Sequence, residues 1–395
     1  MPLDFRQVQE QVYLLGENAV LREQILSDRR QQAWELLVEN AANWEALRRK
    51  VQRIVEQHDP TIRCALPLSG GQERLNARLP APPALAQGTI LAADGSQINP
   101  DRHAEVSYCL VNVGAIQMQI GSAAPPAPTV RSRLIYGDQL YTSGGTMTEA
   151  QVALERDLAE RRILAELGAS APQLPVITFT DGPLELWGAR DQAGSAGFDQ
   201  SLKEYQQALS ELHEQHAITA GYVDSPSANL VLRLLEVAML PEGDLHTIRD
   251  HHPLQGASDL ELFRELLKPG ERSAVFAIQS GSTERYRGHL SLHFFYLHTG
   301  RGQRPLARVE IPRWVAEEPA MVDSLHATLV QQCQILGSRA YPYLLHRAHE
   351  VALVTLAEKD QLTQMILVEY QRRGLVAGEK THKQSMKDLP GRTRY

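Results

Sequence analysis

The order of strand-like and helix-like segments limits the folds that are open to this chain. Three strand-like segments come first, at residues 89–98, 104–120 and 130–137. A segment with helical periodicity at 147–168 and another strand-like run at 174–182 follow them. Strands first, and then an alternation of helices and strands, predict an α/β layer built on a mixed sheet.

The remaining segments continue the alternation and suggest how the chain is divided. We expect further helices at about 199–216, 226–239, 319–336 and 342–371, further strands at about 218–225, 273–280, 290–300 and 306–312, and an irregular stretch at 241–270. The predicted parts are an N-terminal helical region at 1–60, a linker rich in Pro and Gly at 61–88, the main domain at 89–372 and a mobile basic tail at 373–395. The N-terminal helices are interpreted either as a hairpin packed on the main domain or as a dimerisation arm.

Composition excludes several classes of protein. With 43% hydrophobic and 22% charged residues the chain can bury a core, which excludes a mostly disordered protein. The net charge of -7 excludes a basic coat for nucleic acid, but not a local basic groove. Three widely spaced cysteines without a CxxC pair argue against a disulfide framework and fit a reducing compartment. Because we find neither a signal-peptide core nor an apolar run of about 20 residues, we expect a cytoplasmic protein without a membrane span.

The sequence LSGGQ at 68–72 matches the signature of ABC-type ATPases. That signature works with a phosphate-binding loop of the form GxxxxGK[ST], and the chain has no such loop. We therefore discard the ATPase interpretation and regard the Gly-Gly pair as a turn in the linker.

Two aspartates occupy the same local setting. Asp94 in ILAADGS and Asp181 in ITFTDGP each end an apolar strand and precede a glycine, which would let the chain turn sharply. Two such strands side by side would bring like charges together, which is unfavourable unless a cation lies between them. Carboxylate oxygens favour magnesium or manganese. The alternative interpretation is that each Asp-Gly pair only makes a turn.

Two helical segments offer further site residues. Glu155 and Glu160 lie on the predicted helix between the two strands, and either would supply a third carboxylate. In the C-terminal helix, Tyr341, Leu345 and His349 are four residues apart, so they are predicted to share a face. A histidine that meets a carboxylate cluster can bind metal, orient water or contact a phosphate, although a single histidine is more often a core or surface group.

In their order along the chain, these segments resemble the motifs of the NurA nuclease family. LAADGSQ and FTDGPLELW are similar to its two Asp-Gly motifs, with Pro183 where serine is usual. AGYVDSPSANLVLRLLE, RVEIP and YPYLLHRAHEVALV are similar to its Gly-Tyr-Val segment, its late strand and its final helix. The similarity runs from residue 89 to about 357, and the order and spacing of the motifs carry it.

The resemblance implies a ribonuclease H-like fold, in which a mixed five-stranded sheet is flanked by helices, here with an N-terminal helical extension. The site that it implies consists of Asp94, Glu160, Asp181, Tyr341 and His349, with the three carboxylates as metal ligands. Glu160 is preferred to Glu155, because Arg156 and Leu164 stand four residues before and after it as they do in the family.

The resemblance also implies an activity and partners. The activity would be that of a 5′ to 3′ exonuclease on single- and double-stranded DNA and a single-strand endonuclease in the resection of double-strand breaks. It would use manganese, or else magnesium, at a two-metal site. The implied partners are DNA, a HerA-like hexameric translocase and a second copy of the chain in a homodimer.

Contacts to DNA are predicted from basic and aromatic side chains. The candidates are Arg131, Arg133 and Arg161 for phosphates and Tyr222 for an unpaired base. Asp224 and Ser225 stand where basic residues would help, which argues against tight DNA binding without a partner.

Two other interpretations stay open. In the first, the protein has the same fold but no nuclease activity, and is an adaptor that docks on the HerA-type motor and guides DNA. The joint presence of Asp94, Asp181, Tyr341 and His349 argues against this interpretation. The other is an enzyme that acts on RNA or branched DNA, because a fold alone does not fix a substrate.

Overall fold

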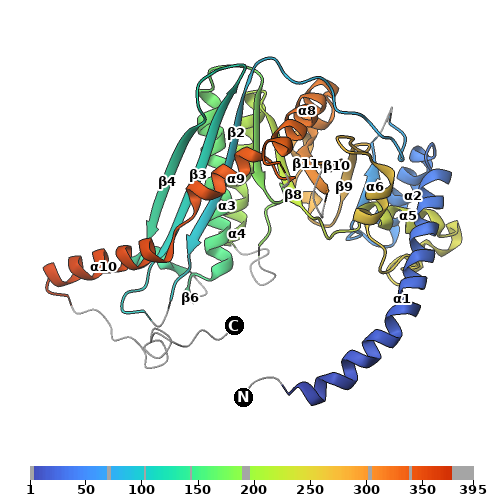
Figure 1. The fold of residues 1–395 in the computed structure, drawn as a ribbon, viewed down its shortest axis with the longest axis horizontal. Helices are drawn as coiled ribbons and strands as arrows, with labels where there is room; N and C mark the ends of the chain where they lie inside the picture. Colours follow the sequence, from blue (N-terminus) through green and yellow to red (C-terminus); the bar gives the residue numbers. More distant parts are fainter. Residues whose placement is uncertain are drawn as a thin grey trace. The chain divides into compact units, whose positions relative to one another are not determined.

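The chain divides into two compact units, which are described separately. The computed structural model describes residues 4–68, 73–101, 104–142, 145–188, 196–300, 305–337 and 340–375. Unit 1 comprises Met1–Ala84 and Gly221–Tyr341, and unit 2 comprises Leu85–Ala220 and Pro342–Tyr395. Figure 1 labels the helices and strands of both units.

Unit 2 is built on a mixed sheet. Its strands are β2 (Gly88–Ile98), β3 (Cys109–Ile120), β4 (Ala127–Ile135), β7 (Val176–Asp181) and the beginning of β8 (Ile218–Asp224). They lie in the order β4-β3-β2-β7-β8, and β2 pairs antiparallel with β3 and parallel with β7. The prediction of a mixed sheet is therefore confirmed, whereas the predicted number of five strands is not, because these strands are part of a sheet of nine among the described residues.

Helices cover both faces of this sheet at β2 and β3. The helices of unit 2 are α3 (Glu149–Ala169), α4 (Ala196–Glu214), α9 (Tyr343–Ala352) and α10 (Leu356–Arg372). A Cβ atom at Gly95 would lie 2.5 Å from Arg156 Cγ of α3, and one at Gly114 would lie 2.6 Å from the Ala352 amide nitrogen of α9. Gly114 is paired across the sheet with Asp94, so it faces the side opposite to Gly95. Accordingly α3 and α9 pack on opposite faces, as Figure 1 shows.

The helix predicted at 342–371 is in fact two helices, α9 and α10. Leu353, which follows α9, has an extended backbone, and Thr355 begins α10 with a capping box to Glu358. The side chains of a capping box satisfy the amide groups that a new helix leaves free, so a threonine followed three residues later by glutamate marks a helix start. The apolar periodicity across the break had concealed this signal.

Unit 1 is built on an antiparallel sheet. Its strands are β1 (Cys64–Pro67), β9 (Phe276–Gln279), β10 (Leu292–His298), β11 (Leu306–Pro312) and the end of β8, in the order β1-β9-β10-β11-β8. Each neighbouring pair is antiparallel. The strand β1 lies inside the segment predicted as a linker at 61–88, so that segment also contributes to the sheet.

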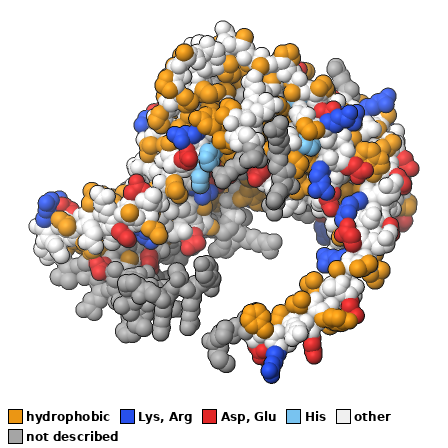
Figure 2. All heavy atoms as spheres, in the orientation of Figure 1, with side chains coloured by type: hydrophobic (Ala, Val, Ile, Leu, Met, Phe, Trp, Pro, Cys, Tyr) orange, Lys and Arg blue, Asp and Glu red, His pale blue; other side chains and the backbone are white. Residues whose placement is uncertain are grey.

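The helices of unit 1 include one long N-terminal helix. They are α1 (Phe5–Glu39), α2 (Trp44–Gln57), α5 (Leu230–Met239), α6 (Asp259–Leu266), α7 (Arg313–Ala316) and α8 (Pro319–Ile335). The stretch at 241–270, predicted as irregular, contains α6, whose N-cap Ser258 accepts a hydrogen bond from the amide of Glu261. Apolar side chains gather along the N-terminal part of α1 (Figure 2), where the most exposed are Phe5, Tyr13, Leu15, Val20 and Leu21.

Short elements complete the fold. They are the turns η1 (Gly137–Leu140), η2 (Glu242–Thr247), η3 (Thr283–Arg285) and η4 (Gly288–Leu290) and the strands β5 (Tyr141–Thr142) and β6 (Gly145–Thr146).

The cysteines Cys64, Cys109 and Cys333 are free and buried. Within the described ranges, no helix combines the length and the apolar character that crossing a membrane requires. Most of LSGGQ (69–72) and of the predicted basic tail (376–395) lies outside the described residues.

Candidate active site

Strand β2 delivers Asp94 to the boundary between the core and solvent. The strand is buried from Gly88 to Ala93, and Asp94 is its first partly exposed residue, with 18% of its side chain accessible. One carboxylate oxygen, Oδ1, accepts a hydrogen bond of 2.8 Å from the Gly95 amide. The other, Oδ2, lies 2.7 Å from Nδ1 of His349. Two expected site residues, Asp94 and His349, are thus in direct contact.

The position of His349 depends on how the end of α9 is held. The carbonyl of Ala352 is among the last in the helix and has no partner within it. Asn112 of β3 donates a hydrogen bond of 2.7 Å to this oxygen, and the hydroxyl of Ser96 donates another. Gly114 leaves room for the helix backbone to lie against the sheet. Together these contacts place His349 beside Asp94.

Glu160 of α3 lies on the face of β2 to which Gly95 points, opposite to the face that α9 covers. Its side chain is buried, at 6% exposure, and its Oε1 would lie 2.7 Å from a Cβ atom at Gly95. Any larger residue at position 95 would therefore collide with Glu160 and with Arg156. We had expected Gly95 to allow a sharp turn, but β2 continues to Ile98, and the glycine is needed for the close approach of α3. At Gly182, in contrast, φ is +87°, which is the turn conformation that favours glycine.

Negative charge accumulates around Glu160. Burial, followed by the carboxylates of Asp157 and Asp94, raises the pKa of Glu160 well above its usual value. Burial also raises the pKa of Asp157, against the opposing effect of Arg156. Arg156 pairs with both, at 2.8 Å from Asp157 and 3.5 Å from Glu160. Three carboxylates and one guanidinium therefore share this part of the molecule.

Sequence reasoning missed the part played by Asp157 and Arg156 in this cluster. Arg156 was used only as a family marker for Glu160, and Asp157 was not singled out. The available signal was spacing, because residues 157 and 160 are three apart on one helix and so are neighbours on its surface.

The second aspartate ends the neighbouring strand. The parallel register of β2 and β7 pairs Ala93 with Thr180, so Asp94 and Asp181 are the next residues on two adjacent parallel strands. Asp181 is exposed. Asp94 and Asp181 therefore lie next to each other on adjacent strands, although only Asp181 ends its strand, because β2 continues to Ile98.

Two other expected residues have different surroundings. Glu155 pairs with Arg133 of β4 at 2.8 Å, and no contact to Asp94 or His349 is recorded for it among the described residues. Tyr341 precedes α9 and belongs to unit 1, where its ring meets the ring of Tyr222 edge-on at a centroid distance of 5.5 Å. Leu345 and His349 are four residues apart on α9, where Leu345 is fully buried and His349 has 62% of its side chain exposed. The prediction that Tyr341 shares this helix face is wrong, because α9 begins at Tyr343.

The predicted DNA contacts divide into exposed and buried residues. Arg131 and Arg133 are exposed on β4, where they pair with Glu166 and Glu155. Arg161 is only 1% exposed, and it donates to Thr180 at 2.7 Å and lies over the ring of Tyr205. The prediction that it contacts DNA is therefore wrong, since its guanidinium joins α3 to β7 and α4 inside the core.

Tyr222 was the predicted stacking residue for an unpaired base. Its side chain is fully buried, with its hydroxyl 3.9 Å from the sulfur of Cys333. A buried ring cannot stack on a base, so this prediction is also wrong. The Gly-Tyr-Val segment ends a nearly continuous run of buried residues in β8, as expected for a core strand, and this run was a better guide to Tyr222 than its aromatic ring.

The donor atoms suit a hard divalent cation. Asp94, Asp157 and Glu160 present carboxylate oxygens, which magnesium and manganese prefer, and their mutual repulsion would be relieved by a cation. In the part of the chain that the structure describes, however, no three His, Cys, Asp or Glu side chains are grouped closely enough to hold a metal ion.

Comparison with known proteins identifies the family of this chain. The NurA domain family model matches residues 88–354. The NurA nuclease from Sulfolobus solfataricus is similar in structure, with 11% identity, coverage of 72% of this chain and 85% of that one, and a TM-score of 0.47. A NurA structure bound to dAMP and manganese has 11% identity, coverage of 91% and 96%, and a TM-score of 0.39. The catalytic domain of human endonuclease V has 10% identity, coverage of 83% and 98%, and a TM-score of 0.34. No curated protein matches the chain.

The mixed sheet flanked by helices, with Asp94 and Asp181 on adjacent parallel strands, defines a ribonuclease H-like α/β protein, as the sequence predicted. The family model covers well over half of the 395 residues. The chain therefore belongs to the NurA domain family, and this membership supports a nuclease.

Proposed function

We propose that this chain is a metal-dependent DNA nuclease that hydrolyses phosphodiester bonds. The observation that carries the proposal is the contact of 2.7 Å between Asp94 of β2 and His349 of α9, together with the charge of Asp94 that acts on the buried Glu160 of α3. Membership of the NurA domain family supports the same activity.

Carboxylates would hold the metal. We propose Asp94, Glu160 and Asp181 as ligands, manganese as the metal with magnesium as the alternative, and two ions as the number bound. A bound divalent cation would neutralise charge at the scissile phosphate and supply an activated water. The raised pKa of Glu160, caused first by burial and then by Asp157 and Asp94, supports this choice, because a nearby cation would favour its ionised form.

His349 would move a proton. Its Nδ1 donates to the Asp94 carboxylate, which fixes the orientation of the ring and leaves Nε2 as the atom that meets substrate or water. With 62% of its side chain exposed, His349 is open to solvent and to a DNA phosphate. Tyr341 remains a proposed phosphate contact, supported by the sequence motif alone.

DNA would be held in part by β4. Arg131 and Arg133 are two residues apart on β4 and so extend from one face of the strand, with 59% and 58% of their side chains exposed. Exposed pairs with carboxylates are weak, so a DNA phosphate can replace Glu166 or Glu155 as the partner.

We further propose the activity and the partners that the family resemblance implied. The enzyme would be a 5′ to 3′ exonuclease on single- and double-stranded DNA and a single-strand endonuclease, acting in the cytoplasm in double-strand break resection with a HerA-like hexameric translocase. A homodimer is also proposed, and the apolar side chains exposed along α1 support it.

The alternative is a catalytically inactive adaptor that docks on the HerA-type motor and guides DNA. An adaptor has no need for a buried glutamate near two other carboxylates, since such repulsion opposes folding. The cluster around Glu160 therefore favours the enzyme.

The test is a nuclease assay on labelled single- and double-stranded DNA, with matched RNA, in manganese, magnesium or EDTA. We expect metal-dependent DNA cleavage that falls about 100-fold or more in Asp94→Ala and His349→Ala. Glu160→Gln should lose activity and Glu155→Gln should keep it, which separates the two candidate carboxylates. Full metal-dependent activity in Asp94→Ala would contradict the proposed site. No cleavage by the wild type, even with the translocase added, would favour the adaptor.

A further inference from the structure

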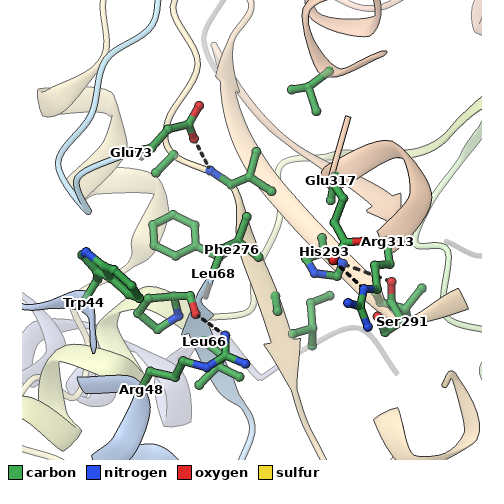
Figure 3. Close-up of a pocket in the computed structure, with 18 of the residues that line it drawn as sticks. Trp44, Arg48, Leu66, Leu68, Glu73, Phe276, Ser291, His293, Arg313 and Glu317 are labelled. Atoms are coloured by element: carbon green, nitrogen blue, oxygen red, sulfur yellow. Dashed lines mark hydrogen bonds and ion pairs between the residues drawn. The ribbon is translucent and has the colours of Figure 1, made fainter. Parts of the chain in front are cut away.

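Unit 1 contains a cavity that the proposed nuclease site does not use. Its volume is about 580 Å³, which lies within the range of about 300–1,000 Å³ typical of small-molecule sites. The floor is the face of β9 and β10, one wall comes from α2, and another comes from α7 and the start of α8. In Figure 3, Trp44 and Arg48 lie on one side of it and His293 and Arg313 on the other, with Phe276 between them.

The cavity holds a buried histidine with an unused nitrogen. His293 of β10 is 6% exposed, and its Nδ1 lies 3.1 Å from the carbonyl oxygen of Ser291. A carbonyl only accepts, so Nδ1 carries the hydrogen. Burial lowers the pKa of His293 to about 4, so the ring is neutral near neutral pH. Its Nε2 is then an acceptor, and no hydrogen-bond partner for it is recorded within the described part of the chain.

Two arginines bring positive charge to the same space. Arg48 of α2 donates one N–H to the carbonyl of Pro67 at 3.0 Å, and Arg313 pairs through Nε with Glu317 at 2.7 Å. Each guanidinium has five N–H groups, so both retain donors for a ligand. The other carboxylate of the lining, Glu73, is already occupied by Arg272 and by the amide of Val275, each at 2.9 Å.

The groups that line the cavity are complementary to a ligand that is both apolar and anionic. A simple anion would use the arginines but neither the apolar floor nor the half-buried ring of Trp44. A purely apolar ligand would bury His293 Nε2 and two guanidiniums without partners, which costs about 1–3 kcal/mol for each polar group. The complementary ligand has an aromatic ring, a hydrogen-bond donor on that ring and an anionic group.

We propose that this cavity binds a nucleotide. The base packs against Trp44 and donates to Nε2 of His293, and the phosphate meets Arg48 and Arg313. The same chemistry is found in a free nucleotide and in the terminal nucleotide of a DNA strand, and the experiment separates the two. The inference does not depend on the proposed nuclease activity.

The experiment is calorimetric titration of the full chain in EDTA, with Asp94→Ala in the background so that cleavage does not interfere. The probes are the four 2′-deoxynucleoside 5′-monophosphates, the matching nucleosides, inorganic phosphate, and an octanucleotide with and without a 5′-phosphate. Arg48→Gln, His293→Phe and Trp44→Leu alter the cavity. Arg49→Gln is the control, because Arg49 is on the same helix but is not part of the lining.

We expect a monophosphate to bind, and each cavity variant to weaken it about tenfold or more, as expected for loss of one charged hydrogen bond or one stacked ring. The Arg49→Gln control should bind like the parent. Tighter binding of the 5′-phosphorylated octanucleotide would identify a strand end as the ligand, and tighter binding of the monophosphate a free nucleotide. Three results would overturn the proposal. They are that no monophosphate binds, that inorganic phosphate binds as tightly as the monophosphate, or that the folded cavity variants bind the monophosphate as tightly as the parent. Because Trp44 and Arg48 are only half-buried, their variants keep the test valid if His293→Phe does not fold.

Discussion

At the residue scale, three consecutive residues of β2 have three different roles. Asp94 contacts His349, Gly95 admits α3, and Ser96 donates to the last carbonyl of α9. The sequence predicted Asp94 from its place at the end of an apolar run, which is a local property. It could not predict the roles of Gly95 and Ser96, because both depend on helices that lie far away along the chain.

A pH-dependent gain in stability should follow from replacing Glu160. Its pKa is raised by burial, then by Asp157 and Asp94, against Arg156 and Arg161. A carboxyl group whose pKa is raised by folding stabilises the fold below its usual value of 4.5, and this stabilisation is lost as pH rises through the raised pKa. In EDTA, Glu160→Gln should therefore raise the free energy of unfolding at pH 7.

Urea unfolding at pH 7 and at pH 4 measures this effect. The gain should shrink at pH 4, where the wild-type group is protonated. Glu155→Gln is the matched control on the same helix, since Glu155 is partly exposed and paired with Arg133. A loss of stability at pH 7 in Glu160→Gln would show that the negative charge of Glu160 is well compensated.

At the element scale, the sequence predicted most strands and helices, because their apolar patterns are local. The strands at 174–182 and 306–312 became β7 and β11 with few changes in their ends. The errors came where periodicity continued through a boundary, as at Thr355, or where a short element lay in a polar stretch, as for α6. Asp94 and Asp181 were predictable because each follows an apolar run, whereas the burial of Arg161 and Tyr222 depended on tertiary packing.

The anchoring of α9 gives a prediction at this scale. Asn112→Ala removes the buried donor to the Ala352 carbonyl, so it should lower the free energy of unfolding by about 1–3 kcal/mol. Because α9 carries His349, cleavage should fall by roughly tenfold to 100-fold even where the variant is folded.

Ser132→Ala is the control for this variant, because it removes a bond to Asn112 Oδ1 and leaves the bond from Asn112 to α9 in place. Urea unfolding and the nuclease assay are the two measurements. If both variants lose activity equally, the anchoring of α9 does not set the position of His349.

At the scale of the whole molecule, the two proposed ligands belong to different units. Asp94, Glu160 and Asp181 are all in unit 2, whereas the cavity with His293 is in unit 1. A ligand stabilises the segments that must be folded to bind it, so hydrogen exchange should slow in the unit that each ligand occupies.

Hydrogen exchange of the full chain, measured by mass spectrometry, tests this separation. Manganese should slow exchange in β2, α3 and β7 and leave β9 and β10 unchanged, and a nucleotide in EDTA should do the reverse. Asp94→Ala should abolish only the effect of manganese, and Arg48→Gln only that of the nucleotide. If manganese slowed exchange in β9 and β10 as strongly as in β2, the separation of the two sites would be contradicted. Such a result would require a coupling free energy between manganese binding and the opening of β9 and β10.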